Sequence, residues 1–237
     1  MTLSDVLVLI MAKHASSRVP CKNLAAVNDM TVLDYTCNAA HAMQVRHDTV
    51  VLTESVAVQK IAARHGFSVF MESGEEVVDY EGRLYERVTT KAESAKIRGG
   101  LKYKVVLVVC ADVPLRPFDH FDVVVREVLR TAADVVITTI QVPIRFHPQR
   151  LYVRQRMGNL EGFMPNGRDD VSQTYRPLFA ATGAATGYAR SVLPKIGQIG
   201  YDHPSLILRT VVCTADQILE IDTPEDLAAF RATQCKP

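Results

Sequence analysis

Residues 6–11 read Val6-Leu-Val-Leu-Ile-Met11, and residues 104–110 read Lys104-Val-Val-Leu-Val-Val-Cys110. A short, unbroken apolar run of this kind is typical of a strand buried on both faces, as the strands of parallel sheets are. Ligands of open parallel sheets bind at the carboxyl ends of the strands. The polar loops that follow these two runs are therefore the first places to look for a functional site.

Outward from these runs, strand patterns alternate with helical patterns. The sequence predicts further strands at 49–53, 67–71, 134–142, 184–188, 208–213 and 217–221. It predicts helices at 33–43, 56–65, 84–97, 118–129 and 224–233, and a short helical turn near 191–196. Gly66 stands at the stop position of the second helix, and Thr223 with Pro224 begins the last one. This alternation predicts an α/β fold, a mostly parallel sheet flanked by helices.

One domain, 1–237, is expected, because the length of 237 residues and the 48% hydrophobic content suit a single core. Residues 143–180 differ from the rest, since they carry many Arg, Gln, Gly and Pro residues and a weak hydrophobic pattern. We interpret this segment as a small protruding β-rich arm within the domain. Its arginines at 145, 150, 154 and 156 form either a solvated face or a surface for an anionic acceptor or a partner arm.

The charges and the apolar stretches exclude several classes of protein. The 27 Lys and Arg residues against 26 Asp and Glu residues leave a formal net charge of +1, whereas a duplex-DNA binder normally carries a clear basic excess. The longest apolar stretches are far too short to span a bilayer. The first residues lack the basic region and cleavage site of a secretory signal. We therefore expect a cytoplasmic protein with neither nucleic acid nor membrane as a partner.

The cysteines and histidines indicate that no transition metal is used. The five cysteines are widely spaced, and no Cys-x-x-Cys occurs, so neither a disulfide framework nor a thiolate zinc site is expected. The seven histidines show neither a His-x-His nor a His-Glu-x-x-His spacing. Any metal must then be held by carboxylate oxygens, which favours Mg²⁺.

The loop after the first strand, Lys13-His-Ala-Ser-Ser-Arg-Val-Pro-Cys-Lys-Asn23, holds the three cations Lys13, Arg18 and Lys22. Such a loop can wrap a polyphosphate, because backbone N–H groups of its Ala-Ser-Ser stretch can face phosphate oxygens while the cations neutralise charge. A solvated basic loop is the alternative, but the position after a fully buried first strand favours phosphate. The loop lacks the Gly-x-x-x-x-Gly-Lys-Ser/Thr spacing of an NTPase P-loop.

Two aspartates stand at the ends of predicted strands, Asp112 after the 104–110 run and Asp222 just before the last helix. Either aspartate alone would more often be a turn residue. Together with the cationic loop they provide two carboxylates for Mg²⁺ and three cations for a triphosphate. This is the equipment of in-line attack at phosphorus, where positioning and charge neutralisation do most of the work.

These segments resemble a known family. Ile10-Met-Ala-Lys-His-Ala-Ser-Ser-Arg-Val-Pro-Cys-Lys-Asn-Leu24 is similar to the N-terminal signature of the N-acylneuraminate and 3-deoxy-manno-octulosonate cytidylyltransferases, which activate acidic sugars. Ala111-Asp-Val-Pro-Leu115 resembles the metal-binding turn of nucleotidyltransferases of this fold. Ile221-Asp-Thr-Pro-Glu-Asp-Leu227 resembles the late segment that supplies their second metal carboxylate. The resemblance implies a Rossmann-like, GT-A-like nucleotidyltransferase sheet.

The resemblance also implies roles for single residues. The implied nucleotide-binding residues are Ala12, Lys13, Ser16, Arg18, Lys22 and Asn23, the implied catalytic residues are Arg18, Lys22 and Asp112, and the implied Mg²⁺ ligands are Asp112 and Asp222. Arg18 and Lys22 would contact the CTP phosphates, and backbone near Ala12 would read the cytosine edge. Lys13 stands where an Arg is usual, which keeps the charge and loses the bidentate fork.

The implied reaction joins CMP from CTP to an acidic acceptor, such as a 2-keto-3-deoxy sugar acid of the sialic-acid type, and releases pyrophosphate. The implied enzyme is a homodimer whose 143–180 arms reach the partner. The Asn-Gly-Ala that usually follows the Arg-Pro pair of these enzymes appears displaced, as Thr182-Gly183-Ala184, so a phosphonate or sugar phosphate is an alternative acceptor. The Lys13 substitution, together with Met11 in place of a usual Pro, leaves a catalytically silent nucleotide-binding or scaffold protein as an alternative of another class.

A second glycine pattern, Thr182-Gly-Ala-Ala-Thr-Gly187, superficially resembles a dinucleotide-binding turn. Such a turn should follow the first strand of a βαβ unit and open a long helix. Here it lies late in the chain and runs into a strand-like stretch, so a dehydrogenase is not favoured.

Overall fold

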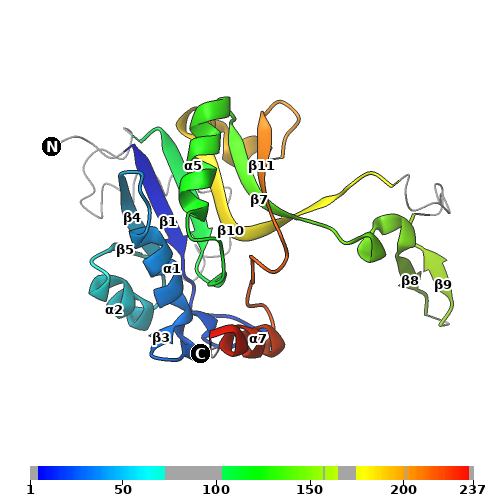
Figure 1. Ribbon diagram of the computed structural model, residues 1–237, viewed down its shortest axis with the longest axis horizontal. Helices are drawn as coiled ribbons and strands as arrows, with labels where there is room; N and C mark the ends of the chain where they lie inside the picture. The colour runs from blue at the N-terminus through cyan, green and yellow to red at the C-terminus, as the bar shows by residue number, and fades with distance from the viewer. Residues whose placement is uncertain (1–4, 73–102, 157, 165–174, 201, 235–237) are drawn as a thin grey trace.

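The computed structural model describes residues 5–72, 103–156, 158–164, 175–200 and 202–234. Its centre is a seven-stranded sheet with the order β11-β7-β10-β6-β1-β4-β5 (Figure 1). The strands of this sheet are β1 (Val6–Met11), β4 (His47–Thr53), β5 (Ser68–Met71), β6 (Val105–Cys110), β7 (Val135–Gln141), β10 (Phe179–Ala189) and β11 (Leu208–Cys213). The α-helices are α1 (Val32–His41), α2 (Val56–Arg64), α5 (His120–Thr131), α6 (Leu193–Ile199) and α7 (Pro224–Gln234).

The two apolar runs are neighbouring parallel strands at the middle of the sheet, with Met11 opposite Cys110. The even-numbered residues of β1 pack with side chains of α1, α2 and α5, and its odd-numbered residues Leu7 and Leu9 pack with α6 and β6. Helices thus cover both faces, which is why the run is apolar at every position. The predicted mostly parallel sheet flanked by helices is confirmed.

Strand β10 is antiparallel to both of its neighbours, β6 and β7. It contains the glycine pattern 182–187, which is therefore a strand with a register shift between Ala181 and Thr186 and not a dinucleotide-binding turn. Packing explains Gly187, since a Cβ atom there would lie 2.9 Å from Val128 Cγ2 and 3.0 Å from Val124 Cγ1 on α5. Helix α5 can rest this close to the sheet only because the side chain is missing.

Replacing Gly187 by alanine is expected to lower the free energy of unfolding by about 1–3 kcal/mol, the usual cost of overpacking a core. Urea denaturation of the variant measures this loss. Gly158, around which nothing lies within 4 Å, is unsuitable as a control because its φ is +86°. Ala180→Gly is a better one, because Ala180 is exposed on the same strand. Unchanged stability of Gly187→Ala would mean that α5 shifts without cost.

Most predicted elements are present with boundaries moved by one to three residues, while β10 begins five residues before the predicted 184. The helix predicted at 84–97 lies outside the described residues. The strand predicted at 217–221 is wrong, because only Leu219 makes a bridge, to Leu115. The Gln217 side chain closes a turn by accepting from Thr214 N, and the chain then follows the loop after β6.

The 143–180 segment leaves the main sheet where β7 ends and returns along the first part of β10 (Figure 1). Its described part holds two 3₁₀ turns, η3 (Ile144–Phe146) and η4 (Pro148–Arg150), and an antiparallel pair, β8 (Tyr152–Arg154) and β9 (Leu160–Gly162). Exposed apolar side chains on it are Ile144, Phe146, Leu151, Tyr152, Val153, Leu160, Phe163, Met164 and Phe179. The described part of the segment projects away from the main sheet in Figure 1, and its role in a dimer stays a prediction.

The C-terminal helix α7 packs against the start of the chain. Phe230 packs edge to face against Tyr35, with 4.9 Å between the ring centroids. Arg231 donates to the carbonyl of Ala26 in β2 (Ala26–Val27). This short strand lies between the 3₁₀ turn η1 (Lys22–Leu24) and β3 (Met30–Thr31). Phe230, Ile221 and Val19 share one buried cluster. This packing fixes Asp222, just before α7, beside the loop that follows β1.

Among the described residues, no helix has the length and apolarity to cross a membrane.

Candidate active site

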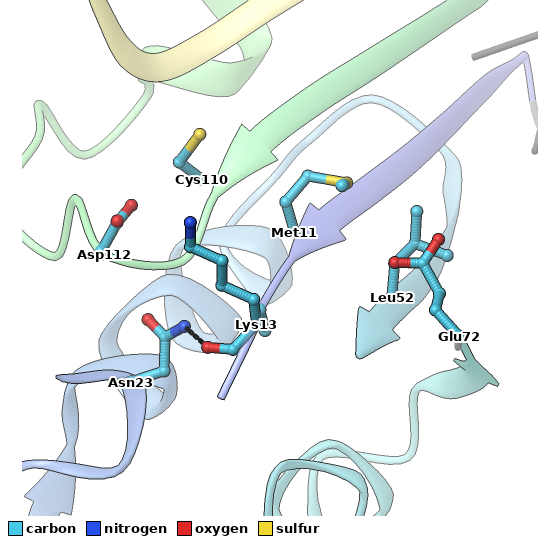
Figure 2. Close-up of a pocket in the computed structure, with 8 residues that line it drawn as sticks. Met11, Lys13, Asn23, Leu52, Glu72, Cys110 and Asp112 are labelled. Carbon is cyan, nitrogen blue, oxygen red and sulfur yellow. Dashed lines mark hydrogen bonds between the residues drawn. The ribbon is translucent and has the colours of Figure 1, made fainter. Parts of the chain in front are cut away.

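An open pocket of about 190 Å³ lies at the carboxyl ends of β1, β4 and β6 (Figure 2). The residues that line it are Met11, Ala12, Lys13, Asn23, Leu52, Glu72, Cys110 and Asp112. Four of them, Ala12, Lys13, Asn23 and Asp112, are among the site residues predicted from the sequence. The pocket therefore lies where the carboxyl-end rule for parallel sheets places ligands.

Asn23 shapes the side of this pocket formed by the loop. Its Nδ2 donates to the Lys13 carbonyl at 2.8 Å, which ties the two ends of the cationic loop together. Its Oδ1 is buried, and no group of the described residues donates to it. A buried acceptor without a donor is costly, so this oxygen is suited to receive a hydrogen bond from a ligand. Figure 2 shows the Lys13 amine directed toward Asp112 and Cys110.

Lys22 joins the two predicted aspartates. Its Nζ lies 2.5 Å from Asp112 Oδ2 and 3.4 Å from Asp222 Oδ1, and it donates to the Ile221 carbonyl at 2.8 Å. Arg18 Nη2 lies 2.6 Å from the same Asp222 oxygen. The Lys22 side chain is only 5% exposed, whereas that of Asp222 is 34% exposed. The structure thus brings three distant segments of the chain into one charged cluster.

The protonation of Lys22 follows from this cluster. Burial alone would lower its pKa, but the hydrogen bond and the charge of Asp112, with Asp222, outweigh burial and raise the pKa above the ordinary value. Lys22 is therefore a fixed positive charge at neutral pH. Together with Arg18, it compensates the charges of the two carboxylates.

Arg116 supports the turn that carries Asp112. Its Nη2 donates to the carbonyls of Cys110 and Val113, and its guanidinium lies 4.9 Å from the Phe121 ring centroid. Burial lowers the pKa of Arg116 to about 9, although the nearby Cys110 and Asp112 oppose this shift. The guanidinium donates hydrogen bonds to carbonyls at and just after the end of β6, and these bonds hold the turn after the strand in one conformation.

Glu220 is a third carboxylate in the cluster, and the sequence reasoning missed it. Burial raises its pKa, and the charges of Asp112 and Asp222 raise it further, while a hydrogen bond from the Gly183 backbone N–H opposes them. Glu220 stands two residues before Asp222. The backbone on both sides of it is hydrogen-bonded to the loop after β6, from Leu219 N to the Leu115 carbonyl and from Ile221 N to the Asp112 carbonyl. Its proximity to the predicted Asp222 was the signal in the sequence.

Glu54, also missed, holds the cationic loop. Its Oε1 accepts from the backbone N–H of His14 at 2.7 Å and of Ala15 at 3.0 Å. Ala15 begins the Ala-Ser-Ser stretch whose amides were expected to face phosphate, and its N–H is instead engaged by Glu54. A carboxylate at this position shows that the loop amides bind an anionic oxygen. Glu54 directly follows β4, at the edge of the sheet where the carboxyl-end rule places ligands.

Replacing Glu54 by alanine is expected to raise the amide exchange rates of His14 and Ala15 about tenfold or more, because their acceptor is lost. Hydrogen exchange followed by NMR measures both amides directly. Glu54→Gln, which keeps a neutral acceptor, is the matched control and should lie between the two. Equal rates in all three proteins would mean that the loop is held by other contacts.

The predicted site residues fall into two adjoining groups. Lys13, Ala12, Asn23 and Asp112 line the pocket, and Arg18, Lys22, Asp112 and Asp222 form the charged cluster. Asp112 belongs to both. Ser16 is half-buried in the loop between them and does not line the pocket.

Comparison with known proteins identifies relatives of this chain. The sequence model of a family described as cytidylyltransferase matches residues 7–153. A 3-deoxy-manno-octulosonate cytidylyltransferase of Koribacter versatilis is 26% identical over 188 residues, which are 78% of this chain and 58% of that protein. A protein of the same name from Leptospira interrogans is 32% identical over 73 residues, 31% of this chain and 30% of that protein. The matches thus span less than two thirds of these relatives.

Solved structures share the fold over nearly the whole chain. The structure of CMP:2-keto-3-deoxy-manno-octonic acid synthetase complexed with CTP has a TM-score of 0.71 at 17% identity and covers 98% of both chains. A 4-diphosphocytidyl-2C-methyl-D-erythritol synthase has a TM-score of 0.67 at 15% identity, covering 99% of this chain and 100% of that one. These likenesses establish a Rossmann-like sheet of the kind found in cytidylyltransferases.

Proposed function

Because the chain belongs to the cytidylyltransferase family, we propose that it transfers the CMP group of CTP to an acidic small-molecule acceptor and releases pyrophosphate. One observation carries this proposal. Asp112 and Asp222 meet beside Arg18 and Lys22, at the carboxyl ends of the central strands. Attack at phosphorus needs this combination of fixed cations and carboxylates around a charged ligand.

Each residue of the cluster has a task in this reaction. Lys13, which lines the pocket, and Arg18 of the charged cluster are both exposed, and they would bind the triphosphate and neutralise the departing pyrophosphate. Lys22, held by Asp112, would supply a third fixed charge. The Asn23 Oδ1, buried beside the pocket, would accept from a nucleotide hydroxyl. Because these groups are positioned before the ligand arrives, little reorganisation opposes the reaction.

Mg²⁺ is the proposed cofactor, and the residues present fit it. Among the described residues, no group of three or more His, Cys, Asp and Glu side chains is arranged as a complete metal site. Mg²⁺ is commonly held by one or two carboxylates together with substrate phosphates, and Asp112 and Asp222 are such a pair. Bound there, the ion would polarise the α-phosphate that the acceptor attacks. The position of the Lys22 ammonium between these carboxylates supports their proposed role as ligands of a cation.

The proposed acceptor is a 2-keto-3-deoxy sugar acid, whose anomeric hydroxyl would attack the α-phosphorus. The name of the Koribacter versatilis relative supports this class. A phosphonate or a sugar phosphate is the alternative acceptor. The segment 182–184 departs from the pattern expected for sugar-acid enzymes, and it lies close to the charged cluster, because the Gly183 backbone N–H donates to Glu220. We also propose that the protein acts as a homodimer joined through the 143–180 arm, since that arm exposes a row of apolar side chains.

A matrix of pyrophosphate release tests the function. The four ribonucleoside triphosphates are combined with sugar acids, phosphonates and sugar phosphates, with and without Mg²⁺. Release with CTP and a sugar acid, dependent on Mg²⁺, is expected. Release with phosphonates alone would select the alternative acceptor. Calorimetric binding of CTP without release in any well would instead favour a catalytically silent nucleotide-binding protein.

A further inference from the structure

We propose that the Glu72 carboxylate selects cytosine over uracil by accepting a hydrogen bond from the exocyclic N4 amino group of the base. This inference rests on the proposed function, because it assumes that a pyrimidine nucleotide occupies the pocket. It adds a specificity-determining side chain to a site in which the family resemblance implied base recognition largely by backbone.

Glu72 occupies a defined place at the pocket. It follows β5, and its backbone N–H donates to the Thr53 carbonyl at 2.8 Å, which continues the pairing of β4 with β5. The residue is only 6% exposed, yet it lines the pocket. In Figure 2, Glu72 and Leu52 lie on one side, Cys110 and Asp112 on the other, and Met11 and Lys13 between them. The carboxylate thus faces a ligand site from inside the protein.

The sheet order fixes which part of a nucleotide reaches Glu72. β5 lies three strands from β6 in the order β6-β1-β4-β5, a separation of about 14 Å. The phosphate-binding charges gather at the β6 end, where Asp112 meets Lys22. A nucleotide bound across the pocket therefore directs its base toward β4 and β5. There Met11 and Leu52 supply apolar surface for the faces of a ring.

The Ala12 N–H donates to the Leu52 carbonyl at 3.0 Å, so this donor is used within the sheet. The N4 amino group of cytosine needs an acceptor, and a side-chain carboxylate at the pocket would supply one. Of the eight lining residues, Glu72 is the ionisable one on the Leu52 side of the pocket.

A carboxylate distinguishes cytosine from uracil by hydrogen-bond polarity. An ionised carboxylate only accepts, and the N4 amino group of cytosine donates. Uracil presents an oxygen at the same position, so two acceptors would face each other. In a buried position, water cannot relieve this mismatch at low cost. Glu72 would thus favour CTP both by attraction and by exclusion of UTP.

Glu72→Gln tests the proposal, because a carboxamide can rotate to accept from cytosine or to donate to uracil. We measure kcat/KM for CTP and UTP with the acceptor that the wild type uses, and the Kd of each nucleotide by calorimetry with Mg²⁺ and no acceptor. The preference for CTP over UTP is expected to fall about tenfold or more in both measurements, mainly through a gain with UTP. An unchanged preference would overturn the assignment, as would a wild type that binds both nucleotides equally.

Two further variants keep the test decisive. Glu72→Asp keeps an acceptor-only group, so it should weaken CTP binding while preserving the preference over UTP; loss of the preference in this variant would also count against the proposal. Glu127→Gln, on α5, should leave the preference unchanged, because Glu127 pairs with Arg130 and does not line the pocket. Failure of the proposed function is separable, because CTP binding without turnover still yields the ratio of dissociation constants.

Discussion

Replacing Asp112 by asparagine is expected to lower kcat/KM for CTP about a thousandfold while the protein stays folded. Asp112 lines the pocket and lies 2.5 Å from Lys22, so its charge is shared between the ligand site and the buried ammonium. Asparagine keeps the shape but removes one of the two carboxylates proposed for Mg²⁺. It also leaves Lys22 with Asp222 as its remaining ion-pair partner in the cluster.

Steady-state pyrophosphate release measures the loss, and circular dichroism during thermal unfolding verifies the fold. The fold should persist, because the backbone carbonyl of Asp112 still accepts from Ile221 N at 2.8 Å. Asp119→Asn is the matched control, since Asp119 lies seven residues further on, is exposed, and makes no capping bond at the start of α5. Near wild-type activity of Asp112→Asn would refute the metal assignment.

Lys22→Met is expected to lower kcat/KM for CTP at least about a hundredfold and to destabilise the fold. Without the ammonium, Asp112 and Asp222 face each other with Arg18 alone against them. Removing one partner of a fully buried ion pair costs about 3–5 kcal/mol. Because Asp222 is 34% exposed and solvent screens it, about 1–3 kcal/mol is expected here.

The stabilisation by Lys22 is expected to decrease at high pH. Asp112, against the opposing effect of burial, raises the pKa of Lys22, so the contribution of Lys22 to stability is complete below pH 10.5 and is lost as the pH rises through the folded-state pKa. Urea unfolding should therefore show the largest gap between wild type and Lys22→Met near neutral pH and a smaller gap in strong alkali. Lys22→Arg, which keeps the charge, should retain most of the stability. An unchanged CTP requirement in Lys22→Met would place the phosphates elsewhere.

The carboxylates of this site show where sequence reasoning reached its limit. Asp112 could be predicted because it ends the strongest apolar run. Glu54 and Glu72 follow strands by the same rule, yet a single Glu after a strand does not reveal in sequence whether it will be buried. Glu220 was missed for another reason, since residues 217–221 were predicted to be a strand. The structure shows them following the loop after β6, with Ile221 N bonded to the Asp112 carbonyl.

The sequence by itself determined the strands and helices around the central sheet and the segments that carry charge, because apolar periodicity and caps are local properties of the chain. The tertiary structure alone decided that Lys22 and Asp222, 200 positions apart, share a contact, and that α7 holds the second aspartate beside the first loop. It also decided that Glu54 would accept hydrogen bonds from amides of the loop after β1, and that Glu72 would be buried at the pocket. The order of strands in the sheet sets these encounters, and that order depends on the packing of all the elements together rather than on any local pattern of residues.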